Sequence, residues 1–61
     1  MKELLEEQLI EYQQKFDANK AETLEMMRKG FPEKEWQDHA KKGAALKMLI
    51  EATILELEKY I

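Results

Sequence analysis

The chain has 61 residues with no cysteine, one histidine and a formal net charge of −3. This length leaves room for one small domain, and the lack of cysteine excludes disulfides and thiolate metal sites. A chain this short buries only about 60% of the surface that its unfolded form exposes. Because small scaffolds usually need a disulfide, a metal or a partner chain to be stable, we expect this one to self-associate.

The charges are unevenly spread along the chain. Residues 1–14 carry one lysine against four glutamates, residues 15–47 carry eight basic groups against six acidic ones, and residues 48–61 carry one lysine against three glutamates. The acidic total gives no general reason to bind nucleic acid. Charges also interrupt every apolar stretch before the ~18 residues that a membrane span needs, and no signal-peptide pattern opens the chain. We therefore expect a cytoplasmic protein with no membrane segment.

The spacing of apolar residues predicts a first helix over residues 2–29. Steps of four and three define a seam, which is the row of residues that faces a second helix. An alternative divides this helix near Asp17–Asn19, because Asn19 and Glu22 resemble a capping box. The seam of the first helix consists of Leu5, Leu9, Tyr12, Phe16, Asn19, Thr23 and Met26.

The segment that follows predicts a tight turn. Gly30 can adopt the left-handed conformation that ends a helix, and Arg28 and Lys29 place positive charge on the last helical turn, where the dipole favours it. Pro32 suits the first position of a second helix, because its missing N–H would be unpaired there in any case. The two helices should therefore run antiparallel.

The same rhythm predicts a second helix over residues 32–60. With the turn centred near residues 30 and 31, residue i of the first helix faces about residue 62 − i of the second. This register places Asn19 opposite Gly43 and leaves a polar layer between two apolar ends of the seam. The seam of the second helix consists of Trp36, His39, Gly43, Leu46, Ile50, Thr53, Leu57 and Tyr60.

The second helix is apolar almost all round between residues 44 and 57, so one neighbouring helix cannot cover it. We therefore predict an all-α fold: a single domain over residues 1–61, folded as an antiparallel helical hairpin that forms a homo-oligomeric bundle, with a dimeric four-helix bundle favoured. The alternative is a hairpin that docks on an unrelated protein. The predicted oligomer interface consists of Ala44, Ala45, Met48, Leu49, Ala52 and Leu55.

The polar layer allows two interpretations. Asn19 in a seam is most typical of a register device, since a buried amide needs its partner aligned. The layer is also a possible pocket for a small anionic ligand such as a nucleotide, although no glycine-rich phosphate loop accompanies it. Its residues would be Asn19, Thr23, His39 and Gly43, with Lys20 and Lys42 beside them.

Catalytic chemistry has few candidates. The chain has no serine, and Thr23 and Thr53 occupy seam positions, where packing or a bond to a backbone carbonyl explains them. Glu35 and His39 are spaced i, i+4 and could reach one metal, but the Glu-x-x-His spacing of di-iron bundles is absent because position 36 is tryptophan. We expect no enzyme, no cofactor and no metal site.

An aromatic and basic cluster surrounds the turn. Trp36 could cap the apolar end of the bundle, or it could anchor a partner, since tryptophan is enriched in contact hot spots. We expect the partner-binding residues to be Trp36, Phe31, Arg28, Lys29, Lys34, Lys41 and Lys42.

The predicted layout is similar to that of the Rop-type RNA-binding proteins, helical hairpins of roughly 60 residues that dimerise into four-helix bundles. The resemblance covers length and layout without a shared motif, and it implies nucleic-acid binding as one function. Our leading hypothesis is a non-enzymatic homo-oligomer that binds and regulates or inhibits another macromolecule, as small bacterial or phage-encoded proteins do. A nucleotide binder or sponge at the subunit interface is the second hypothesis.

Overall fold

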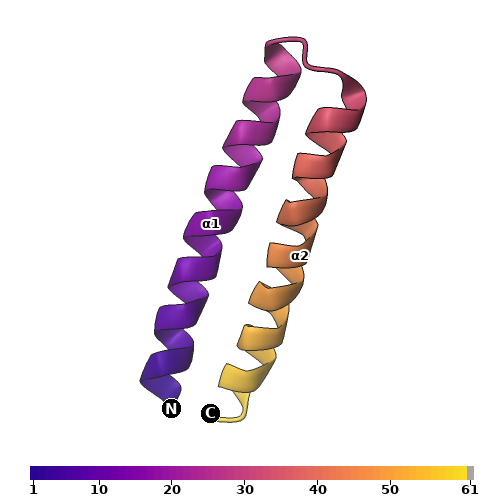
Figure 1. The fold of residues 1–61 in the computed structure, drawn as a ribbon. Coiled ribbons are helices and arrows are strands. Elements are labelled where there is room, and N and C mark those ends of the chain that lie inside the picture. The colour runs from indigo at the N-terminus through magenta and orange to yellow at the C-terminus, as the bar shows by residue number, and fades with distance from the viewer. Residues whose placement is uncertain (61) are drawn as a thin grey trace.

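The structure is a computed structural model that describes residues 1–60. Helix α1 spans Lys2–Arg28 and helix α2 spans Glu33–Glu58, and the two pack side by side as an antiparallel hairpin (Figure 1). The start of α1 and the end of α2 lie together at the pole opposite the turn. The predicted all-α hairpin is confirmed. The predicted domain also includes residue 61, which lies outside the described residues.

Helix α1 is continuous, so the alternative that divides it near residues 17–19 is wrong. No glycine or proline interrupts this stretch, and its glutamate, lysine, leucine and glutamine residues favour helix. Asn19 does not cap a helix: its side chain donates a hydrogen bond to the carbonyl of His39 on α2, at 3.0 Å. Asn19 and Glu22, which resemble a capping box in the sequence, therefore both contact His39 on α2.

The turn ends α1 with a Schellman motif, the paired hydrogen bonds that close a helix around a left-handed residue. Gly30 has φ +83°, its N–H donates to the carbonyl of Met27 at 3.1 Å, and the N–H of Phe31 donates to the carbonyl of Met26 at 3.0 Å. The left-handed glycine predicted from the sequence is thus confirmed.

The bounds of the second helix differ slightly from the prediction. Pro32, with ψ 142°, is the N-cap and not the first helical residue, and its carbonyl accepts hydrogen bonds from the N–H groups of Glu35 and Trp36 at 3.0 and 3.4 Å. The helix ends at Glu58, with Lys59 as its C-cap. The extended ψ turns the chain between the helices, so α2 begins one residue late.

Both predicted seams face each other, and every seam residue but one is buried or half-buried. The exception is Tyr60, which is 49% exposed. It follows the last residue of α2, and the register places it opposite Lys2, which offers no apolar surface. Two half-buried residues, Gln8 and Glu25, lie outside the predicted seams.

The hairpin is too thin to enclose a core. Within residues 1–60 no apolar side chain is buried, and the buried residues are Gly43 and Thr53. The radius of gyration is 14.2 Å, whereas a compact domain of this length has about 10.5 Å. Its accessible surface of 4906 Å² also exceeds the roughly 4,200 Å² of a compact protein of this mass. The hairpin alone therefore leaves surplus surface open to water.

Neither helix within residues 1–60 is long and apolar enough to cross a membrane.

Candidate functional site

Two exposed apolar side chains lie at the turn end. Met27 is 46% exposed and Phe31 is 41% exposed, while Trp36 is half-buried on the first turn of α2. The Schellman motif fixes the backbone beneath Phe31, so its ring is presented from a rigid turn. This end can therefore offer an apolar spot to a partner with little loss of backbone freedom.

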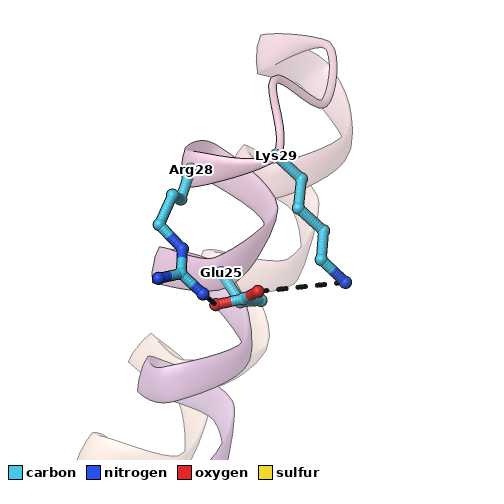
Figure 2. A network of polar contacts seen from close by, with 3 residues as sticks. All are labelled: Glu25, Arg28 and Lys29. Atoms are coloured by element: carbon cyan, nitrogen blue, oxygen red, sulfur yellow. Dashed lines mark hydrogen bonds and ion pairs between the residues drawn. The ribbon is translucent and has the colours of Figure 1, made fainter.

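Acidic groups offset part of the positive charge predicted at this end. The carboxylate of Glu25 accepts a hydrogen bond from the guanidinium of Arg28, and the Nζ of Lys29 lies 3.9 Å from its other oxygen (Figure 2). Lys41 pairs in the same way with Asp38 at 4.0 Å. These groups remain hydrated, so a polyanion would have to compete with the local carboxylates for them.

Lys34 and Lys42, the other predicted basic residues, are exposed and form no ion pair within residues 1–60. They come from different parts of α2: Lys34 lies beside the turn, and Lys42 lies two helical turns further along. The predicted cluster is therefore divided between the turn itself and the side of α2.

The structure also brings the predicted polar layer together. The amide of Asn19 bonds to α2 as described above, and the hydroxyl of Thr23 donates to the carbonyl of Asn19 at 2.9 Å. A Cβ added to Gly43 would lie 2.4 Å from Oδ1 of Asn19, so the amide fits only over a glycine. These contacts match the register-device interpretation.

His39 is not among the residues that line the groove described below. Its Nε2 lies 3.1 Å from a carboxylate oxygen of Glu22, close enough for an ion pair when the imidazole is protonated. Nε2 is buried and forms no hydrogen bond within the described chain, so the geometry of this contact is loose. The contact joins α1 to α2 beside the polar layer.

An open groove of about 270 Å³ crosses the two helices over Gly43. Its walls are mainly apolar, because the polar groups of Asn19 and Thr23 are used between and within the helices. Of the residues predicted for an anion pocket, Lys20 supplies the only charge here. The groove is lined by Phe16, Asn19, Lys20, Thr23, Leu24, Ala40, Gly43 and Ala44.

A second open hollow, of about 650 Å³, lies toward the chain ends on the same side of the hairpin. Sequence reasoning missed it, although four of its residues flank the two seams beside Phe16 and Ile50, and that arrangement is the signal that could have found it. Its rim is charged by Asp17, Lys47 and Glu51, which leaves no single sign to attract an ion. The remaining lining residues are Gln13, Phe16 and Ile50.

The outer face of α2, the side away from its seam, carries most of the predicted oligomer interface, and Ala44 and Leu49 flank it. All six predicted residues are exposed: Met48 is 71% exposed, Leu55 62% and Leu49 45%, and Ala44, Ala45 and Ala52 are exposed as well. Single exposed apolar residues are ordinary, but a contiguous stripe of them marks an interaction surface.

No group of three or more metal-ligating side chains lies close together in the part of the chain that the structure describes. No protein-family model, curated protein or solved structure matches the chain.

Proposed function

We propose that the chain is a non-enzymatic homo-oligomer that binds and regulates another macromolecule. The observation that supports it is the exposed apolar face of α2 on a hairpin whose described residues include no buried apolar side chain. An isolated hairpin with this surface is marginal in stability. A second copy on that face would bury the stripe and supply the missing stability.

The oligomer is tested by changing the centre of the stripe. Met48→Glu places a charge where we expect a second copy, so it should convert the protein to a monomer. Ala18→Glu, at an exposed position on α1, is the matched control and should leave the assembly intact. Light scattering at tens of micromolar measures the mass of each variant. A strictly monomeric wild type would refute the oligomer.

We place the partner-binding surface at the turn end, where the exposed ring of Phe31 lies among basic residues. Such a surface suits a macromolecule with an apolar spot bordered by acidic groups. The regulatory role is the part of the proposal that depends on this surface. A cytoplasmic location stays a prediction from the sequence.

The partner surface is tested by a comparison of two exposed aromatic residues. Phe31→Ala removes the ring at the turn, and Tyr60→Ala removes a similarly exposed ring at the opposite pole. In affinity capture from the source cell followed by binding titration, only Phe31→Ala should weaken binding, by about tenfold or more. If Phe31→Ala and Tyr60→Ala weaken partner binding equally, the turn end is not the partner-binding surface.

The same titration separates a protein partner from a nucleic acid. If the captured molecule is RNA or DNA, affinity falls steeply as salt rises, because phosphate contacts release counterions. A protein partner bound through Phe31 should show a much flatter salt dependence. A steep slope would support the alternative implied by the Rop-type layout.

A further inference from the structure

Helix α2 repeats the rhythm of its seam on the opposite side. Each position of the outer row comes two residues after a seam position, which is about half a turn around the helix. The outer row is polar at both ends and apolar in the middle. It consists of Asp38, Lys41, Ala45, Met48, Ala52, Leu55 and Lys59.

Small and large side chains alternate in the apolar middle of this row. If a second α2 runs antiparallel across it, about a two-fold axis at residue 50, residue i faces residue 100 − i. Ala45 then meets Leu55, and Met48 meets Ala52, so every large side chain packs against a small one. A parallel pair would instead place each alanine against itself and each large side chain against itself.

One pair of charges beside the row favours the same arrangement, whereas the row itself places Lys41 opposite Lys59. Side chains that flank the row on the same side also meet in an antiparallel pair, and on the flank that carries residues 42, 49 and 56 residue i lies against about residue 98 − i. The exposed Lys42 of each copy then lies against Glu56 of the other, and Leu49 meets Leu49 near the axis. Within its own chain Lys42 forms no ion pair among residues 1–60, and Glu56 contacts only Lys59, at 3.1 Å. A parallel pair would instead bring the acidic segments 1–14 and 48–60 of both copies together.

The available area is also of the right size. The hairpin exposes about 700 Å² more than a compact protein of its mass, and a standard interface buries about 800 Å² per partner. One copy on the outer face of α2 therefore accounts for most of the surplus.

We infer that two copies pair antiparallel through the outer faces of α2, with Ala45 against Leu55, Met48 against Ala52 and Lys42 against Glu56. The inference rests on the proposed function, since it gives the geometry of the proposed oligomer. It places the two turns at opposite poles, about 57 Å apart, because 19 residues separate each turn from the axis at 1.5 Å per residue. The dimer therefore binds two partner molecules at separate ends.

Cysteine cross-linking tests the direction and the register, and the natural chain has no cysteine to interfere. An equimolar mixture of Ala45→Cys and Leu55→Cys should form a disulfide-linked dimer on mild oxidation. Neither variant alone should do so, because residues 45 and 45, or 55 and 55, lie about 15 Å apart along the axis, beyond the roughly 7 Å that a disulfide spans. Cross-linking of each variant with itself would show a parallel pair and overturn the inference.

A charge exchange keeps the inference testable if Leu55→Cys weakens the assembly. Lys42→Glu and Glu56→Lys should each raise the dissociation constant of the homodimer by about tenfold, because both place like charges together at two symmetric sites. Mixing the two variants restores opposite charges at both sites and should restore wild-type affinity. If the mixture of Lys42→Glu and Glu56→Lys binds no more tightly than either variant alone, the proposed register is wrong.

The two proposals fail in different ways. A monomeric wild type refutes the oligomer and this geometry together. A dimeric wild type with no cross-link in the mixture and no restoration by charge exchange refutes only the antiparallel α2 contact, and leaves the oligomer in place through another face.

Discussion

At the scale of single residues, the two glycines serve opposite needs. Gly30 has φ +83° with no atom within 4 Å of an added Cβ, so its requirement is conformational. Gly43 is helical, and its requirement is space, because an added Cβ would meet the side chain of Asn19. The need for glycine at position 30 can be predicted from the neighbouring turn residues. The need for glycine at position 43 depends on Asn19, which is 24 positions away in the sequence.

Replacing Gly30 by alanine should lower the free energy of unfolding by about 1 to 2 kcal/mol, the cost of a left-handed L-residue. Gly30→Asn should cost less, because asparagine tolerates this conformation. Urea denaturation at a fixed protein concentration measures both. Equal stability of wild type and Gly30→Ala would contradict the capping role.

Gly43→Ala should destabilise the hairpin although alanine favours helix. The gain in helix propensity is about 1 kcal/mol. Asn19, however, must move away and lose its bond to His39, and a half-buried amide without a partner costs about 1 to 3 kcal/mol. We expect a net loss of about 1 kcal/mol or more, by urea denaturation.

The double variant Asn19→Ala/Gly43→Ala should be more stable than Gly43→Ala alone, because it removes the clashing amide. Ala18→Gly, at an exposed position on α1, reports the cost of helix propensity by itself. If Gly43→Ala proves more stable than wild type, the close contact with Asn19 does not limit this position.

At the scale of the elements, the helices are held in register by a few contacts between them. Asn19 over Gly43, together with Glu22 beside His39, confirms the predicted pairing of residue i with residue 62 − i near the middle of the hairpin. Thr53, also in the seam, is buried and donates to the carbonyl of Leu49 at 2.8 Å. Both threonines thus bond to a backbone carbonyl, which is one of the two explanations that the sequence offered for them.

The ion pairs at the end of α1 should contribute little to helix stability. Glu25 pairs with Arg28 and Lys29 on the surface, and exposed pairs of this spacing are worth less than about 1 kcal/mol. Glu25→Gln should therefore lower the free energy of unfolding by only a few tenths of a kcal/mol at low salt. The difference should shrink in about 1 M salt.

Glu7→Gln, on a residue with no ion pair in the described chain, is the control for the loss of one charge. A decrease of several kcal/mol in Glu25→Gln beyond this control would mean that the network in Figure 2 holds the turn together.

At the scale of the whole molecule, stability should depend on assembly. Because a second copy binds the folded chain and not the unfolded one, the melting temperature should rise with protein concentration. Circular dichroism melts over a hundredfold range of concentration measure this. The melting temperature of Met48→Glu should be lower than that of wild type and independent of concentration. A wild-type melting temperature that does not change with concentration would contradict assembly-coupled folding.

The sequence by itself determined the two helices, the left-handed glycine between them and nearly all residues of both seams. These features follow from local periodicity and turn chemistry, which act over a few neighbouring residues. Only the tertiary structure decided the role of Asn19, because its amide bonds to a carbonyl of the other helix. It likewise decided the groove over Gly43 and the loose contact of His39, since these depend on how closely two helices approach and on where each side chain then points.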